Sequence, residues 1–291
     1  MIQNKNKTLR DLLNTKKLSK VAGAHDGLSA KLAEKNGFDA IWASGLGISA
    51  IQTVPDASIL TMTEFLEAAI IMNDSCNIPV IADCDSGFGN IHNVDRMIKK
   101  YESSGISGVC LEDKVFPKLN SFDDREQLLV SSKEFCAKIK TAKDSRVDND
   151  FVIIARVEAL IAGLGQDEAY NRAKAYSEAG ADAILIHSKQ KNPNEIVEFI
   201  KRWDLSTPLV VVPTKYPSIT MGELENLGVR FSIYANQSLR ASVKAMDEVL
   251  SNIMKNGSTE PIENKISNVS DIFDLQDIPK MKKREEIVYS K

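Results

Sequence analysis

The chain has 291 residues, of which 43% are hydrophobic and 26% charged, enough for a large core under a soluble surface. Its formal net charge of −3 excludes the strongly basic field that binding to nucleic acid or an anionic membrane requires. No apolar stretch approaches the ~20 residues that span a bilayer.

The N-terminal residues lack the apolar segment of a secretory signal. The four cysteines show no metal-binding spacing, and free thiols are typical of a reducing compartment. We therefore expect a cytoplasmic protein that binds neither membrane nor nucleic acid.

Eight short apolar runs recur along the chain, and a helix-like segment separates each run from the next. We expect strands at Val21–His25, Ala40–Gly45, Pro79–Asp85, Gly108–Asp113, Phe151–Glu158, Ala183–His187, Pro208–Thr214 and Phe231–Asn236. We expect helices at about 8–19, 29–35, 61–76, 92–104, 124–144, 166–179, 194–203, 221–226 and 238–255. This alternation predicts a (β/α)8 TIM-type barrel with an extra N-terminal helix. Continuous apolar runs, rather than alternating ones, are typical of a parallel sheet that is covered on its outer face.

We assign residues 1–255 to the barrel and find no second domain. Residues 256–291 are not needed to close a barrel, and their composition is mixed and charged. We expect them to form a C-terminal helical tail that packs on the barrel or on a neighbouring subunit. A frayed surface tail is the alternative.

Acidic side chains follow neighbouring runs. Asp83 and Asp85 are two residues apart, so in a strand both carboxylates point to one side. Glu112 ends the next run, and Asp56 lies in the preceding loop. Four carboxylates facing one small volume repel each other unless a cation lies among them, and oxygen ligands favour Mg²⁺ or Mn²⁺ over zinc. The alternative is that these residues cap strand ends and form surface ion pairs.

Arg156 and His187 end the fifth and sixth runs, and both are candidates for binding an anion at the barrel mouth. A buried pair between Arg156 and Glu158 or Glu112 is the alternative for the arginine. A lone histidine such as His187 is often a core residue with its hydrogen bonds satisfied. Its place at the end of a strand favours function.

Two loops complete the predicted site. Ser44, Gly45 and Leu46 follow the second run, where glycines let backbone N–H groups approach a ligand oxygen, as in an oxyanion pocket. The loop over 113–121 contains Lys118 and Asn120, which predicts either a mobile lid that excludes water or an ordinary solvated loop.

Five motifs together resemble the isocitrate lyase/phosphoenolpyruvate mutase superfamily, and especially its phosphoenolpyruvate mutase branch. They are DCDSGFGN (83–90), EDKVFPKLNS (112–121), ARVEALIAG (155–163), GADAILIHSK (180–189) and VVPTKYP (211–217). The resemblance extends from about Val21 to Ser270. It implies a Mg²⁺-dependent barrel that interconverts phosphoenolpyruvate and phosphonopyruvate. It also implies a homotetramer, a dimer of dimers that exchanges terminal helices between subunits.

The resemblance assigns roles to the acidic residues. Asp85 matches the direct metal ligand, and Asp83 and Glu112 match ligands that act through water. Asp56 matches the acidic residue close to the reacting centre.

The remaining matches concern the substrate. The family holds the pyruvyl oxygens with a hydroxyl and backbone N–H groups, and the matching residues are Ser44, Gly45 and Leu46. Groups around the substrate anion match Arg156 and His187, and lid residues match Lys118 and Asn120.

Three other functions stay open at this point. Phosphonopyruvate hydrolase shares the barrel and the metal, but Asn120 favours the mutase branch. The superfamily's carbon–carbon lyases use a KKCGH-type loop, whereas Asp113–Lys118 contains no cysteine. A non-catalytic barrel is disfavoured, because none of the residues whose loss would support it is missing, namely Asp56, Asp85, Lys118 and Arg156. One departure is that FDDREQLL, after the lid, is a residue shorter than the usual connection.

Overall fold

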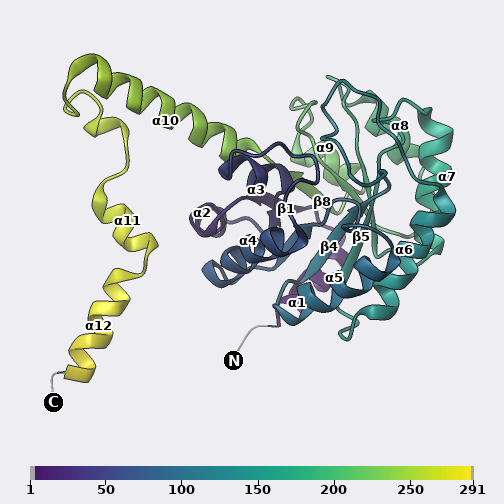
Figure 1. Ribbon diagram of the computed structural model, residues 1–291, viewed down its shortest axis with the longest axis horizontal. Helices are drawn as coiled ribbons and strands as arrows, with labels where there is room; N and C mark the ends of the chain where they lie inside the picture. Colours follow the sequence, from purple (N-terminus) through teal and green to yellow (C-terminus); the bar gives the residue numbers. More distant parts are fainter. Residues whose placement is uncertain (1–3, 290–291) are drawn as a thin grey trace. The chain divides into compact units, whose positions relative to one another are not determined.

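The computed structural model describes residues 4–289, and eight parallel strands in it form a closed barrel surrounded by helices (Figure 1). The strands are β1 (Ser19–Ala24), β2 (Ala40–Ala43), β3 (Val80–Asp83), β4 (Gly108–Glu112), β5 (Val152–Val157), β6 (Ala183–Ile186), β7 (Leu209–Val211) and β8 (Phe231–Tyr234). Each strand pairs with the next, and β8 pairs with β1 to close the ring. The predicted (β/α)8 barrel is confirmed.

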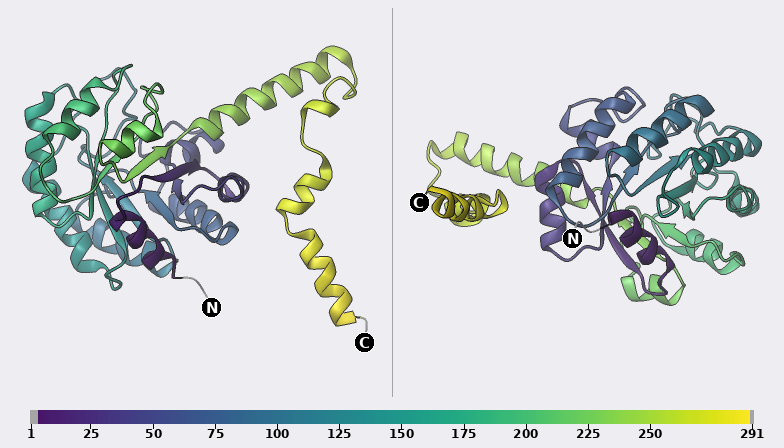
Figure 2. Two further views of the ribbon diagram at one scale, coloured as in Figure 1. Left: turned by 180° about the vertical axis from the view of Figure 1, so that it is seen from behind. Right: turned by 90° about the horizontal axis from the view of Figure 1, so that it is seen from below.

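Most helices of the barrel lie close to the predicted segments; α3 was not predicted, and α6 is shorter than predicted. They are α1 (Lys5–Asn14), α2 (Gly27–Lys35), α3 (Gly45–Ile51), α4 (Met62–Ser75), α5 (Ile91–Ser103), α6 (Ser132–Ser145), α7 (Gly165–Glu178), α8 (Asn194–Arg202) and α9 (Met221–Asn226). Figure 2 shows the same ring of helices around the strands from behind and from below.

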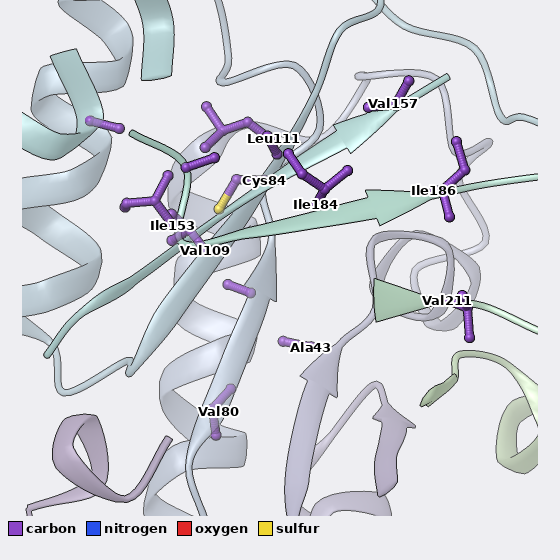
Figure 3. Close-up of a cluster of buried hydrophobic side chains, with 14 of the residues drawn as sticks. Ala43, Val80, Cys84, Val109, Leu111, Ile153, Val157, Ile184, Ile186 and Val211 are labelled. Carbon is purple, nitrogen blue, oxygen red and sulfur yellow. The ribbon is translucent and has the colours of Figure 1, made fainter. Parts of the chain in front are cut away.

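Side chains alternate along each strand between the barrel interior and the surrounding helices. In β5, Val152 and Ile154 belong to an inner apolar cluster, whereas Ile153 and Val157 belong to an outer cluster under the helices (Figure 3). Both faces of the sheet are therefore buried, which explains the continuous apolar runs of the sequence.

Helix α1 packs against the barrel interior, because Leu9 and Leu13 belong to the inner cluster. The side chain of Asn4 accepts a hydrogen bond from the Lys7 N–H and caps this helix. The helix begins and ends earlier than the predicted 8–19, since the chain must be extended at Ser19 to pair with β8.

The helix predicted at 124–144 is wrong in its first part, because α6 spans Ser132–Ser145. The residues before α6 are extended instead, and they run antiparallel to the start of the loop after β4. Lys114 and Leu129 form the bridge between the two segments. Ser131 then caps α6. The apolar residues at 128–130 contributed to the predicted helix pattern. In the structure their backbone instead pairs with residues 113–115 and closes the base of the loop after β4.

Contacts within the chain divide it into two units, Met1–Asn236 and Gln237–Lys291. The second unit contains α10 (Gln237–Asn256), the short 3-10 helix η1 (Glu263–Lys265), α11 (Val269–Leu275) and α12 (Ile278–Tyr289). The predicted C-terminal helical tail is thus present, and none of its α-helices buries a side chain within the described residues. Among the helices of residues 4–289, none combines the length and apolarity needed to cross a membrane.

Gly23 marks a close approach between β1 and the end of β8. A Cβ atom there lies 2.0 Å from the Ala235 carbonyl oxygen, a backbone atom that cannot turn away. We expect Gly23→Ala to reduce the free energy of unfolding by about 3 kcal/mol or more. Gly222→Ala in α9 is the control, because its Cβ meets nothing within 4 Å. We expect it to be neutral or to stabilise by up to about 1 kcal/mol. Urea titration measures both, and equal effects would contradict the close approach.

Candidate active site

A pocket of about 520 Å³, its opening included, lies at the carboxyl-terminal mouth of the barrel. Its walls come from strand ends and the segments that follow them, where (β/α)8 enzymes carry their active sites. It is lined by Trp42, Ser44, Leu46, Asp56, Asp83, Lys118, Asn120, Ser121, Phe122, Arg156, His187, Val212, Thr214, Ala235 and Asn236. Eight of the predicted site residues are in this lining. The other three, Gly45, Asp85 and Glu112, lie directly behind it.

Asp83, Glu112 and Arg156 point into the barrel because of strand alternation. The inner apolar cluster contains the residue two positions before each of them, namely Ile81, Cys110 and Ile154. Glu112 and Arg156 are opposite each other in the β4–β5 register, and Arg156 Nε lies 3.2 Å from Glu112 Oε2. The apolar interior therefore ends in a charged layer at the mouth.

Asp85 reaches the site by a different route from the one predicted. Strand β3 ends at Asp83, and Asp85 has a φ of +48°, which is uncommon for a residue with a side chain. Its carboxylate accepts a hydrogen bond from Ser58 Oγ at 3.1 Å and lies 3.3 Å from Lys118 Nζ. The turn, rather than strand alternation, therefore places Asp85 beside Asp83.

The loop over 114–121 covers the pocket. Lys118 Nζ donates to Asp56 Oδ1 at 2.5 Å, and Asn120 Nδ2 donates to Asp56 Oδ2 at 2.6 Å. The Lys118 backbone N–H also donates to Ser58 Oγ at 3.1 Å. Burial tends to raise the pKa of Asp56, but Lys118 and Asn120 outweigh it and lower that pKa. These contacts hold the loop over the pocket, which is the arrangement expected of a closed lid.

Glu158 is the centre of a buried charge network that sequence analysis considered only as a partner for Arg156. Arg156 Nε lies 2.6 Å from Glu158 Oε1, and Lys114 Nζ lies 3.2 Å from Glu158 Oε2. Ser121 Oγ donates to Glu158 at 2.6 Å and accepts from Arg156 at 2.8 Å and from Lys114 at 2.7 Å. In the sequence, Ser121 is marked only by its place beside Asn120 at the end of the EDKVFPKLNS motif.

His187 lies against this network. Its Nδ1 is 2.9 Å from both Arg156 Nη2 and Glu158 Oε1, so the tautomer decides which contact is a hydrogen bond. Burial and then Arg156 lower the pKa of His187, despite the opposing effect of Glu158. The imidazole is therefore neutral near pH 7. If its Nδ1 accepts from Arg156, its Nε2 carries a proton that it can donate to an anion.

The segment after β2 is helical rather than the glycine-rich loop that we expected. Ser44 is the N-cap of α3, and its Oγ accepts from the Gly47 N–H at 3.2 Å. Gly45 and Leu46 therefore occupy the first helical turn, whose N–H groups have no acceptor within the helix. Such groups suit a ligand oxygen, so the helical segment offers the same N–H donors as the expected loop. A Cβ on Gly45 would lie 3.2 Å from Asp83 Oδ2, which leaves little room for a larger residue.

Negative charge exceeds positive charge at this mouth. Three cationic side chains contact the acidic ones, and they belong to Lys114, Lys118 and Arg156. Five carboxylates gather there, and they belong to Asp56, Asp83, Asp85, Glu112 and Glu158. The excess of two negative charges equals the charge of one divalent cation.

The acidic groups fit a hard divalent cation. Burial raises the pKa of Asp83 to about 6 and that of Asp85 to about 7, so both carboxylates lack sufficient positive charge nearby. Asp85 Oδ1 and Glu112 Oε1 are buried and have no hydrogen-bond partner within residues 4–289. In that part of the chain no three acidic, histidine or cysteine side chains converge closely enough to bind one ion directly. An ion with few protein ligands and several waters, as Mg²⁺ prefers, fits this arrangement.

The closed barrel and the charged pocket at its carboxyl-terminal mouth are the architecture of a (β/α)8-barrel enzyme. The chain belongs to the phosphoenolpyruvate phosphomutase family, whose sequence profile matches residues 9–254.

Relatives of two activities are equally similar to the chain. The phosphonopyruvate hydrolase of Variovorax sp. (strain Pal2) is 47% identical over 280 residues, which cover 96% of this chain and 97% of that protein. The crystal structure of phosphoenolpyruvate phosphomutase from Streptomyces platensis subsp. rosaceus has a TM-score of 0.96 and 47% identity, covering 98% and 99% of the chains. A crystal structure of phosphonopyruvate hydrolase in complex with oxalate and Mg²⁺ has a TM-score of 0.93 and 46% identity, covering 99% and 100%. Overall similarity therefore does not separate the two reactions.

Proposed function

We propose that the chain interconverts phosphoenolpyruvate and 3-phosphonopyruvate, moving phosphorus between the oxygen and the carbon of a pyruvate enolate. The observation that supports this most is the closed lid, in which Lys118 and Asn120 both bind Asp56. A closed lid excludes the water that would otherwise capture the phosphoryl group. In the forward direction this reaction makes a carbon–phosphorus bond, the step that phosphonate biosynthesis requires.

The pocket offers separate donors for the two ends of the substrate. Ser44 and the N–H groups of Gly45 and Leu46 lie after β2 and suit the pyruvyl oxygens. Arg156, near the end of β5, and His187, directly after β6, line the pocket with Asn120 and suit the phosphoryl oxygens. A loose phosphoryl transfer depends on positioning and charge stabilisation more than on a nucleophile. These donors meet that need.

The proposed metal is Mg²⁺, for which Mn²⁺ is a plausible substitute. Asp85 would bind it directly, and Asp83 and Glu112 would hold its water ligands. The Mg²⁺ in the related hydrolase complex supports this proposal. When bound, the ion supplies positive charge that stabilises the enolate oxygen. Lys118 and Asp56 keep the adjacent lid closed.

Phe122 helps to seal the pocket. Its ring centroid lies 5.6 Å from that of His187, and Lys215 Nζ lies 4.6 Å from the Phe122 ring centroid on the neighbouring loop. We expect Phe122→Ala to admit water and to increase the share of phosphate and pyruvate among the products of phosphonopyruvate by about fivefold, which corresponds to ~1 kcal/mol. Val147→Ala, at a 90% exposed site after α6 and outside the lining, is the control. An unchanged product ratio in Phe122→Ala would exclude a sealing role.

The alternative function is that of a phosphonopyruvate hydrolase, which yields pyruvate and phosphate. The relative at 47% identity supports it, because the same pocket serves if the lid admits water. The hydrogen bond from Asn120 to Asp56 favours the mutase, because it helps to hold the lid closed against water.

Two coupled assays separate these reactions. Lactate dehydrogenase alone reports pyruvate made from phosphonopyruvate, which is the product of hydrolysis. Adding pyruvate kinase and ADP reports phosphoenolpyruvate as well, and a blank without the protein corrects for direct reduction of the substrate. We expect a signal that depends on pyruvate kinase. Equal rates in the two assays would identify a hydrolase.

We also propose a cytoplasmic homotetramer, a dimer of dimers, in which residues 256–291 pack on a neighbouring subunit. The four cysteines are all free, as a reducing compartment would keep them. Along α10, exposed apolar side chains form a stripe at helical spacing that consists of Val243, Met246, Leu250 and Met254. A second copy of the chain would cover this stripe.

Leu250→Asp places a charge in the middle of the α10 stripe, where its side chain is 63% exposed in the single chain. We expect the assembly to dissociate at least tenfold more readily, because a buried interface excludes an unpaired carboxylate. Light scattering over a dilution series measures this change. Asn252→Asp, on the opposite face of α10, is the control. A variant mass equal to that of the unmodified chain at every concentration would rule out this interface.

A further inference from the structure

One wall of the pocket has no role in the proposed reaction so far. It consists of the residues that follow β7, among which Val212 and Thr214 line the pocket. Thr214 Oγ1 is buried and has no hydrogen-bond partner within residues 4–289. A buried hydroxyl without a partner is unfavourable unless a ligand satisfies it. Thr214 is thus a polar group that faces the pocket and lacks an acceptor.

The topology places Thr214 at the phosphoryl end of the pocket. Strand β7 pairs with β6 through Val211 and Ile186, and His187 directly follows Ile186. Lys215, which directly follows Thr214, contacts the ring of Phe122. That ring in turn lies against His187. Ser44, at the pyruvyl end, follows β2 and is separated from β7 by β8 and β1.

The backbone holds this side chain in place. The Thr214 N–H donates to the Val212 carbonyl at 2.8 Å, so the residue sits in a tight turn just after the strand. Lys215 leaves that turn toward the outside and contacts the lid, whereas Thr214 lines the pocket. The backbone at Thr214 is therefore fixed before a substrate arrives, which reduces the entropy lost on binding.

We propose that Thr214 is a specificity-determining residue whose hydroxyl donates a hydrogen bond to an oxygen of the substrate's phosphoryl group. This inference rests on the proposed function only in that the substrate carries a phosphoryl group, so it holds for a mutase and for a hydrolase alike. A tetrahedral phosphoryl group presents three oxygens, and Arg156 and His187 approach it from the neighbouring strands. Thr214 supplies a neutral donor from the third side.

The test compares Thr214→Val, which removes the hydroxyl at nearly constant shape, with Thr214→Ser, which keeps it. Consumption of phosphonopyruvate with Mg²⁺ gives kcat/KM regardless of the product. Oxalate, which has the carboxylate oxygens of the pyruvyl end but no phosphoryl group, serves as a binding probe by calorimetry. Thr141→Val, on the outer helix α6, is the matched control.

We expect Thr214→Val to lower kcat/KM about tenfold, a typical effect for one hydrogen bond to a charged group. Oxalate should bind this variant with unchanged affinity, and Thr214→Ser should recover most of the loss. Unchanged kcat/KM, or equal weakening of oxalate and phosphonopyruvate, would overturn the assignment. A failure of the proposed mutase function is distinct, because it would change the product of the unmodified enzyme and leave this comparison intact.

Discussion

Replacing Asp85 with alanine is expected to reduce turnover at least about 10³-fold and to remove the stabilisation by Mg²⁺. The Asp85 carboxylate is buried behind the pocket wall, with Ser58 at 3.1 Å and Lys118 at 3.3 Å. Asp85 is the one acidic residue of the turn over 84–88, so the variant has no carboxylate at this place. At a Mg²⁺ concentration one hundred times its Kd, the unmodified protein gains about 2.7 kcal/mol of stability. The variant should gain none.

Thermal unfolding with and without Mg²⁺ measures the metal effect independently of activity. Asp167→Ala is the control, since Asp167 is 88% exposed and pairs with Arg202 on the outer helices. It should keep both the turnover and the stabilisation by Mg²⁺. Mg²⁺-dependent turnover that survives in Asp85→Ala would show that the metal is bound elsewhere.

Replacing Arg156 with alanine is expected to reduce both stability and activity. Its guanidinium lies 2.6 Å from Glu158 and 3.2 Å from Glu112, and both carboxylates are buried. Removing one member of a buried ion pair leaves an uncompensated charge and costs about 3–5 kcal/mol. We expect turnover to fall on the order of 10³-fold, as when an arginine that stabilises a transferring phosphoryl group is lost.

Arg156→Lys separates the two effects. It keeps the positive charge beside Glu158 but lacks the planar fork that also reaches Ser121 and His187. Urea titration should show that most of the stability returns, whereas phosphonopyruvate turnover should stay low. Full activity in Arg156→Lys would mean that only the charge matters and that the fork does not hold the phosphoryl group.

Most of the fold could be predicted because a covered parallel barrel imposes a simple pattern. Every strand buries both faces, so eight apolar runs stand out from the helices between them. Two segments were exceptions, the helix α3 where a loop was expected and the helix predicted at 124–144. There the apolar residues at 128–130 are used to close the base of the lid through the bridge between Lys114 and Leu129. The pattern of apolar residues alone does not distinguish a buried helix face from a segment that closes a loop.

The site was predictable where strands position it. Asp83, Glu112 and Arg156 continue the inward register of apolar side chains, so their position follows from alternation. Asp85 did not follow from alternation, because a turn with a positive φ places it. Such a turn has no strand pattern that sequence analysis can detect.

Other site residues depend on contacts between distant segments. Ser121 meets Glu158 and Lys114 only when the lid is closed, and no local pattern marks it as the centre of that network. Thr214 is distinguished by the absence of a partner within the described residues, which only the packed structure reveals. The resemblance to a known family supplied the roles of lid and metal residues, and spacing alone would have left both open.

The most direct test of the account is ³¹P NMR of the purified protein with phosphonopyruvate and Mg²⁺. If phosphorus moves within a pocket closed by the lid, phosphoenolpyruvate is the main product and little phosphate forms. Phosphate as the main product, with pyruvate in equal amount, would contradict that claim and show that the closed lid still admits water to the phosphoryl group.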